Sequence, residues 1–325
     1  MSEWLHDKTG PLYLSLAAVG WYMASIAATA ALTAVRDTPG RRALAVWAVM
    51  LPIVVLASII GHYEIVIGMI FASSVASMTL VLGIVTISTH RTQPTLPRKT
   101  WGLILPVALI CFLIGLHGGF HWIHAVVLLI QGIVIYGLWN DPSNSKPPMR
   151  VQTAGPGHRA VLLAVAGIGA VGAAWLAITA TQQIGQKLNI PYHGVVTAIM
   201  LAPAMVLAMI GLGLHDANED HYDLAVSGQV GFVLLNLCLT LPLATAIWLS
   251  RPLWLSIPVE EAPVALPYPM SVWRVDTIML VIVGFLLLPV SLGRWNIGKF
   301  EGIGLVVIYV VFLMLTVLAS LSSLL

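Results

Sequence analysis

The sequence predicts an all-α, polytopic membrane protein with ten transmembrane helices, arranged as two five-helix repeats that are inverted relative to each other. Of the 325 residues, 59% are hydrophobic and only 9% are charged, whereas soluble domains carry about a quarter of their residues as charged side chains. Apolar runs of about 20 residues, the length that crosses a bilayer core, recur along the chain. Basic residues gather in alternate loops, and short stretches of sequence recur in the two halves.

Continuous apolar stretches bounded by charged residues, proline or glycine predict the ten helices. They are expected near residues 11–35, 42–60, 64–88, 101–117 and 121–139, and then near 158–185, 191–214, 223–249, 273–292 and 301–325. Residues 1–140 would form the first repeat and residues 158–325 the second. Residues 141–157, rich in Pro, Ser and Asn, have the composition of a linker. Residues 252–273 are expected to form the longest outer surface loop.

Basic residues orient the predicted helices, because Lys and Arg in short loops are retained in the cytoplasm. One side holds eleven of the fifteen Lys and Arg residues: Arg36, Arg41, Arg42, Arg91, Arg98, Lys99, Lys146, Arg150, Arg159, Arg294 and Lys299. The linker is therefore expected in the cytoplasm and both termini outside it, in a bacterial inner (plasma) membrane. A formal net charge of +2 is too small to suggest a nucleic-acid partner, so the lipid bilayer is the expected environment.

Two short matches indicate an internal repeat. Residues 62–68 (HYEIVIG) recur as 221–228 (HYDLAVSG), each opening the third helix of its half, and residues 50–57 (MLPIVVLA) recur as 201–208 (LAPAMVLA) in the second helix. Because each half has an odd number of helices, the copies would insert in opposite directions, as in many secondary transporters. The repeat places Pro52 and Pro203 at mid-membrane. A proline there frees a backbone carbonyl, so it marks either a packing kink or a polar site between the repeats.

The third helix of each half resembles the cation/calcium exchanger superfamily, the sodium/calcium exchanger-like membrane proteins. Its alpha-repeat pattern is matched in the first copy by Glu64, Gly68, Ser73, Leu80, Val81, Leu82 and Gly83, and in the second by Asp223, Leu224, Ala225, Val226, Gly231, Asn236 and Leu241. Residues 296–302 (NIGKFEG) resemble the opening of that family's last helix. The resemblance implies ten helices, outer termini and a cytoplasmic link, which agrees with the topology predicted from the basic residues.

The same resemblance shows where this chain departs from the family. Family members carry a G-T-S-x-P-E signature whose two glutamates are the principal cation ligands. Aligning Pro52 and Pro203 with its proline puts Ile53 and Ala204 where those acids would stand. The family's other polar ligands fall on Ser77 and Asn236, and its G-S-N becomes residues 72–74 (ASS). A degenerate, carboxylate-free site is therefore expected, with Ser73, Ser74, Ser77, Asn236, Pro52 and Pro203 along the ion path. Calcium favours carboxylate ligands, so high-affinity calcium exchange is not expected.

Other polar residues leave two interpretations open. Glu64 and Asp223 begin helices, where an acid either caps the helix and interacts with its dipole or guides ions in. His117, His121 and His124 gather near a predicted outer turn, where they would be interfacial polar residues or hold a transition metal. No cofactor is expected otherwise.

Three hypotheses about function follow. The first is a secondary transporter that resembles sodium/calcium exchangers and moves a cation or small solute by alternating access. The alternative is a transport-inactive scaffold or a subunit of a larger membrane complex, with a membrane partner or a second copy of the chain. A membrane-embedded enzyme is disfavoured, because no helix supplies an acid and a histidine at catalytic spacing.

Overall fold

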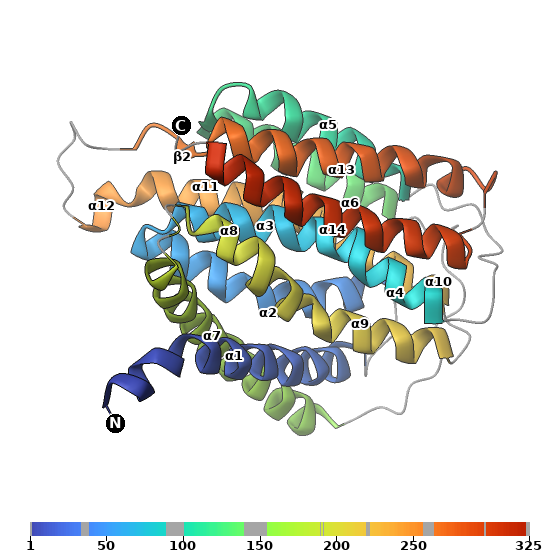
Figure 1. Cartoon of the computed structure of the whole chain (residues 1–325). Coiled ribbons are helices and arrows are strands. Elements are labelled where there is room, and N and C mark those ends of the chain that lie inside the picture. Colours follow the sequence, from blue (N-terminus) through green and yellow to red (C-terminus); the bar gives the residue numbers. More distant parts are fainter. Residues whose placement is uncertain are drawn as a thin grey trace.

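The structure is a computed structural model, and it describes residues 2–33, 39–88, 101–139, 155–188, 190, 192–218, 222–255, 263–295 and 297–322. These residues form ten helical rods (Figure 1). The first five rods are α1 (Ser2–Thr33), α2 (Pro39–Ile60), the continuous α3 (Tyr63–Ala76), η1 (Ser77–Val81) and α4 (Leu82–Ser88), then η2 (Trp101–Leu103) with α5 (Ile104–Gly115), and α6 (Trp122–Trp139).

The second five rods repeat this order. They are α7 (Pro156–Lys187), the continuous α8 (Gly194–Val196), η4 (Thr197–Leu201) and α9 (Ala202–Asn218), then α10 (Tyr222–Leu235), η5 (Asn236–Thr240) and α11 (Leu241–Ser250), and finally α13 (Met270–Ser291) and α14 (Lys299–Ser322). Here η1, η4 and η5 are π-helical turns and η2 is a 3₁₀ turn. All ten predicted helices are therefore present, and eight are long and apolar enough to cross a membrane, whereas α5 and α6 offer shorter apolar stretches.

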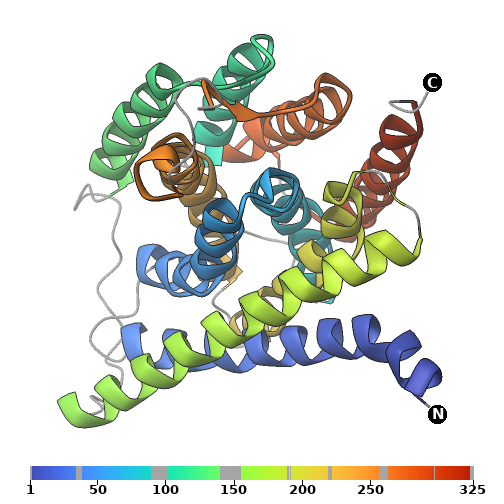
Figure 2. The same ribbon diagram turned by 90° about the vertical axis from the view of Figure 1, so that its left-hand side faces the viewer.

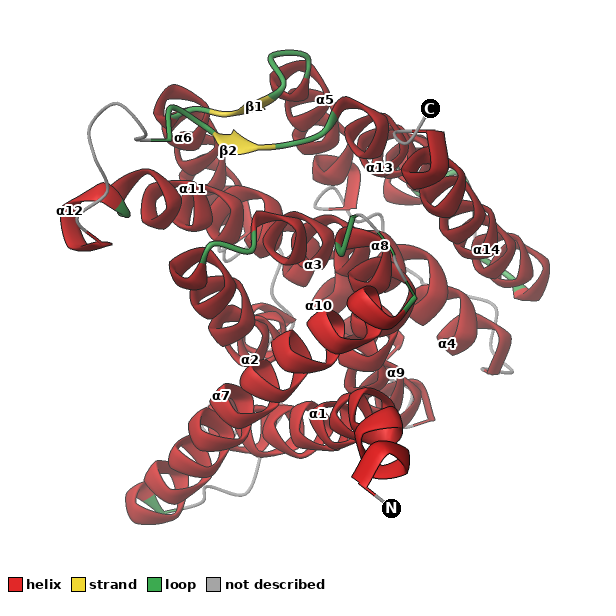
Figure 3. Cartoon of the chain, turned by 60° about the vertical axis from the view of Figure 1, so that its left-hand side comes forward, coloured by secondary structure: helices red, strands yellow, loops and turns green. Residues whose placement is uncertain are grey.

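The predicted loop at residues 252–273 is partly wrong. It contains the short helix α12 (Pro252–Leu255) and the strand β2 (Leu266–Pro267), which pairs antiparallel with β1 (Gly119–Phe120), as Figure 3 shows. Helix α13 begins at Met270, earlier than expected, because Pro269 has an extended ψ of 132° and sets the helix start. Residues 256–262 lie outside the described part of the chain.

Successive rods run in alternate directions between two ends of the bundle. Helix α1 begins and α14 ends at the left-hand end of Figure 1, which also carries β1, β2 and the α2–α3 turn. We call this the ribbon end, and the other, where α9 ends and α10 begins, the opposite end. Corresponding helices of the two sets of five run in opposite directions: α1 starts at the ribbon end and α7 at the opposite end.

The rod formed by α3, η1 and α4 lies at the centre of the bundle. Every residue from Ile65 to Ala76 is buried, and α2, α8, α9, α10, α13 and α14 pack around this rod. By contrast, α7, α13 and α14 each leave several large apolar side chains exposed, such as Ile168, Phe285 and Met314. This distribution fits outer helices that face hydrocarbon and a central rod that faces only protein.

Corresponding helices of the two sets of five make equivalent contacts. Helix α1 packs on its counterpart α7, and α5 on α13; α2 packs on α10 as α9 packs on α3; and α6 packs on α11 as α14 packs on α4. Figure 2 shows α1 and α7 side by side as a separate layer below the rest. A Cβ added to Gly20 would lie 3.1 Å from the Cβ of Ala173, whereas Gly167 and Gly172 face open space. Small residues therefore allow close approach on only one face of α7.

Candidate functional site

A buried polar cluster lies where the central rod meets η5. The Asn236 side-chain nitrogen donates to the Oγ atoms of Ser73 and Ser74, at 3.2 and 3.3 Å. All three side chains are fully buried. The Asn236 Oδ1 atom has no hydrogen-bond partner and is out of contact with solvent. A buried amide oxygen without a partner is costly, so this atom is positioned to accept a hydrogen bond from a solute or to coordinate a cation.

Both serines of this cluster are held by their own helix. Ser73 donates to the Met69 carbonyl and Ser74 to the Ile70 carbonyl, one turn earlier on α3. Ser73 also contacts the Met50 sulfur on α2, at 3.5 Å. Each serine hydroxyl therefore donates to a carbonyl of α3 and accepts from the Asn236 side chain.

Ser77, predicted to be the counterpart of Asn236, does not bond to it. Its hydroxyl donates instead to the Gln229 Oε1 atom on α10, at 2.9 Å. Ser77 begins the π turn η1, and Asn236 begins the π turn η5. Each bonds to the corresponding helix of the other set of five: Ser77 to Gln229 on α10, and Asn236 to Ser73 and Ser74 on α3. We refer to six buried side chains as the polar centre: Met50, Ser73, Ser74, Ser77, Gln229 and Asn236.

The backbone around the polar centre departs from the regular α-helix at three π turns, η1, η4 and η5. The π turns η4 and η5 are each followed by a proline that lacks an N–H donor, Pro203 and Pro242. Single π turns occur frequently at functional sites. Pro52 also interrupts α2, two residues after Met50, but α2 contains no π turn. Sequence comparison alone did not predict the π turns or this asymmetry between the two halves.

No carboxylate belongs to the polar centre. Ile53 is fully buried and Ala204 partly so, at the positions where the family resemblance expects acids. Glu64 stands instead in the first turn of α3, at the ribbon end, and Asp216 stands near the end of α9, at the opposite end. The polar centre therefore offers dipoles but no formal charge to a ligand.

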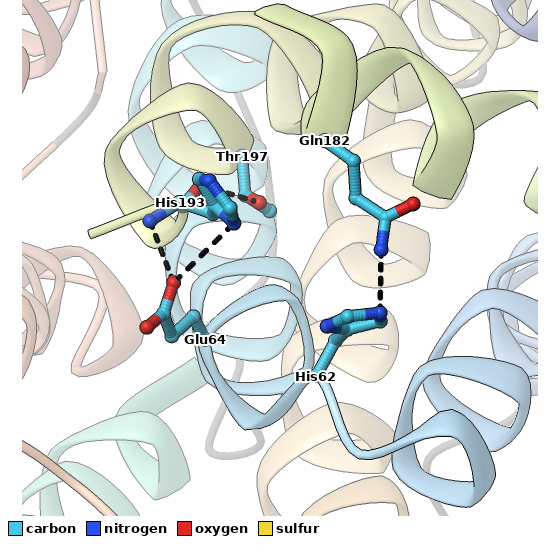
Figure 4. Close-up of polar contacts among 5 residues, drawn as sticks. All are labelled: His62, Glu64, Gln182, His193 and Thr197. Carbon is cyan, nitrogen blue, oxygen red and sulfur yellow. Dashed lines mark hydrogen bonds and ion pairs between the residues drawn. The ribbon is translucent and has the colours of Figure 1, made fainter. Parts of the chain in front are cut away.

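Figure 4 shows the polar contacts at the ribbon end. The Glu64 carboxylate accepts from the His193 backbone N–H at 2.6 Å and lies 3.8 Å from the His193 Nδ1 atom. The His62 and Gln182 side chains meet at 2.6 Å. Glu64 therefore does not cap its own helix, which corrects the capping interpretation, although its place in the first turn still suits the helix dipole. Through its contacts with His193, Glu64 links α3 to the segment before α8. The side chain of Asp223, the counterpart of Glu64, lies outside the described residues.

Partial burial lowers the pKa of His62, at the ribbon end. Burial lowers the pKa of His62 below its usual 6.5, and the neighbouring His193 and Arg251 act in the same direction, whereas Glu64 opposes them. Arg251 packs over the α2–α3 turn, where Gly61 has a φ of +102° and an added Cβ would lie 2.6 Å from the guanidinium. Only glycine fits this turn without displacing Arg251.

A small pocket lies toward the opposite end of the bundle. Its cavity of about 30 Å³ is lined by residues of α1, α2, α9 and α10, including Arg42, Asp216 and Gln229. Arg42 and Asp216 form an ion pair, and Asp216 is only 3% exposed. Asp216 is therefore a buried residue of α9, although it follows the helix expected near residues 191–214. Because Gln229 also bonds to Ser77, the pocket reaches the polar centre.

The three histidines near the α5–α6 turn lie close together, and two of them contact backbone groups. The His117 and His121 rings each lie 5.4 Å from the His124 ring. His117 Nδ1 lies 3.3 Å from the Ile114 carbonyl oxygen, and His124 Nδ1 lies 3.2 Å from the His121 backbone N–H. Across the residues that the structure describes, no group of His, Cys, Asp or Glu has the geometry of a metal site. The metal interpretation of this cluster gains no support.

Comparisons with known proteins match part of the sequence to a family and the fold to solved structures. Residues 158–318 match the family described as sodium/calcium exchanger protein. The fold is similar to that of the sodium-calcium exchanger NCX_Mj soaked with 10 mM Na⁺ and 10 mM Sr²⁺, with a TM-score of 0.65 and 20% identity over 93% of this chain and 97% of the other. It is also similar to the H⁺/Ca²⁺ exchanger CAX, with a TM-score of 0.72 and 12% identity over 98% of this chain and 86% of the other. No curated protein sequence matches significantly.

Family and fold agree with the contacts described above. The matched residues 158–318 include η4, η5 and Asn236, and the similar folds extend over the first half as well. The family consists of membrane transporters, not enzymes. The chain is thus an integral membrane protein whose second half, residues 158–318, matches the sodium/calcium exchanger family and whose fold is similar to that of solved cation exchangers over more than nine-tenths of its length.

Proposed function

We propose that this protein is a secondary transporter that carries a monovalent cation through the polar centre. The observation that carries this proposal is the buried, unpartnered Oδ1 atom of Asn236 beside the hydroxyls of Ser73 and Ser74. Amide and hydroxyl oxygens are ligands for hard cations. A small neutral solute that donates hydrogen bonds is the second ligand class that the same atoms accept.

The lack of formal charge at the polar centre favours a monovalent cation over a divalent cation. The Born cost of moving an ion into low dielectric rises with the square of its charge, so a divalent ion costs about four times as much as a monovalent ion of the same size. No carboxylate of the polar centre offsets that cost. The site is therefore suited to Na⁺ or K⁺, and poorly suited to Ca²⁺.

Alternating access is the proposed mechanism, with residues 1–140 and 158–325 as two inverted repeats. The symmetric helix contacts and the opposite directions of α1 and α7 support this division. In such transporters one repeat or bundle rocks against the other around a midplane site. The ribbon-end contacts of Glu64 and the pocket beside Arg42 would then close the two sides of the path, with the ribbon end outside the cytoplasm.

Flux into proteoliposomes tests the proposal. Uptake should follow a Na⁺ or K⁺ gradient and be lost in Asn236→Ala and in the double variant Ser73→Ala/Ser74→Ala. The control is Thr316→Val on α14, since that hydroxyl bonds only within its own helix, to the Phe312 carbonyl. Unchanged flux in Asn236→Ala would contradict the site. Absence of wild-type flux under every gradient, together with a stoichiometric partner on purification, would support the scaffold alternative.

A further inference from the structure

A buried acid lies on α13, outside the polar centre. Asp276 is 2% exposed and accepts a hydrogen bond from the Tyr268 hydroxyl at 3.0 Å. It stands six residues after Met270, so it lies about 9 Å along the helix from its first residue. An ionisable residue within a transmembrane helix is uncommon and marks a functional hypothesis by default. The family resemblance assigns no role to this position.

The surroundings of Asp276 contain no balancing positive charge. Within the described chain, no Lys, Arg or His comes within ion-pair distance of its carboxylate. On its own helix Arg274 is exposed. The titratable groups near this region on the neighbouring elements are Tyr268 from the β2–α13 segment, Tyr192 from the segment before α8, Tyr63 and Glu64 from α3, and Cys111 from α5. All of these groups are neutral or acidic.

One of these neighbours connects Asp276 with the ribbon end. The Tyr192 hydroxyl is buried without a hydrogen-bond partner, and it lies near enough to Asp276 and Glu64 to be affected by both charges. Glu64 is itself only partly buried and sits in the first turn of α3. The order Glu64, Tyr192, Asp276 therefore leads from the ribbon end to the buried acid.

The central rod connects Asp276 with the polar centre. The Tyr268 ring, which donates to Asp276, stacks on the Phe71 ring of α3 with centroids 5.0 Å apart. Phe71 precedes Ser73 and Ser74 on the same helix by two and three residues. A movement of this part of α3 when a cation binds to Asn236 would thus also move Tyr268.

A carboxylate buried without a positive partner is expensive, whereas the neutral acid is tolerated. Asp276 is therefore expected to hold a proton while its surroundings are dry, and to lose it when water or a cation reaches it. This exchange forms or breaks only the O–H bond of the carboxyl group, with water as proton donor and acceptor.

We propose that Asp276 is the proton-binding residue of this transporter, so that a proton is released as a cation enters the polar centre and taken up as it leaves. The proposal rests on the transport function proposed above and specifies its coupling ion. It also assigns to α13 an acid that the polar centre itself lacks, since Ile53 and Ala204 stand where the family resemblance expects acids.

Proteoliposomes that contain a pH-sensitive dye test this coupling. When Na⁺ or K⁺ moves through the wild-type protein, the luminal pH should change in the sense of opposite proton movement. Asp276→Asn should reduce this pH change to that of empty liposomes, and Asp276→Glu should restore it. Glu301→Gln is the matched control, because that carboxylate only accepts from the Gly298 N–H at the start of α14.

Two further measurements keep the test decisive if Asp276→Asn does not fold. Tyr268→Phe removes the hydrogen-bond donor to the ionised carboxylate, so the pH at half-maximal flux should rise. An infrared spectrum of the wild-type protein should show a protonated-carboxyl band that titrates and that persists in Glu301→Gln. A proton movement unchanged in Asp276→Asn, or a pH profile unchanged in Tyr268→Phe, would overturn the inference.

The outcomes separate this inference from the proposed function. Wild-type cation flux without any proton movement would overturn the role of Asp276 and leave the cation transporter standing. Absence of wild-type cation flux would contradict the proposed function itself. In that case the infrared titration still shows whether Asp276 binds a proton.

Discussion

Replacing Asn236 with aspartate should convert the uncharged polar centre into a site that depends on divalent cations. The substitution keeps the side-chain shape but removes the donor that bonds to Ser73 and Ser74 at 3.2 and 3.3 Å. The two lost hydrogen bonds lower the free energy of unfolding by about 1 kcal/mol each. If the buried carboxylate remains ionised, the loss is several kcal/mol. We expect a loss of about 2–5 kcal/mol without a divalent cation.

Calcium should offset part of that loss. A ligand that binds only the folded protein at 100 times its Kd stabilises it by about 2.7 kcal/mol. Thermal unfolding of purified protein in detergent should therefore shift upward with Ca²⁺ for Asn236→Asp, but not for wild type or Asn236→Ala. An equal response of Asn236→Asp and Asn236→Ala to Ca²⁺ would refute the claim that Asn236 lies at a cation site that lacks only charge.

Two stability predictions concern the surrounding fold. Gly115→Ala should destabilise the protein by about 1–3 kcal/mol, because the added Cβ would overlap the Trp273 indole ring. Gly167→Ala, which faces open space, should unfold at the wild-type temperature or slightly higher. His62→Asn should reduce the loss of stability on acidification, measured as melting temperature against pH. Because the pKa of His62 is lowered in the folded protein, the unfolded chain protonates first, so stability falls as the pH drops below about 6.5. An unchanged pH dependence of the melting temperature in His62→Asn would contradict this reasoning.

The helices were predictable because hydropathy and the bilayer thickness leave little choice. Each apolar run became a helical rod. Helix α1 begins earlier than expected, at Ser2, and α13 begins earlier, at Met270, after the extended Pro269. The π turns were not predictable, since π and α turns present similar apolar sequences. The proline following η4 and η5 was the only local signal, and Pro52 shows that a proline alone does not produce a π turn.

The candidate site was predictable only in part. The family resemblance indicated Ser73, Ser74 and Asn236, which the structure brings into contact, but it did not indicate Gln229. Asp216 lies beyond the helix end expected near residue 214, whereas α9 continues four residues further, to Asn218. A single acid or amide within an apolar run was the signal that would have indicated Gln229 and Asp276.

Direct observation of a bound cation tests the central claim, that Asn236 Oδ1 is a ligand in an uncharged membrane site. Crystals or vitrified samples in Rb⁺ or Tl⁺ would locate a monovalent cation by its scattering. We predict cation density within coordination distance of Asn236 Oδ1 and the hydroxyls of Ser73 and Ser74, and none there in Asn236→Ala. A protein that transports the cation but shows density only elsewhere would contradict this account.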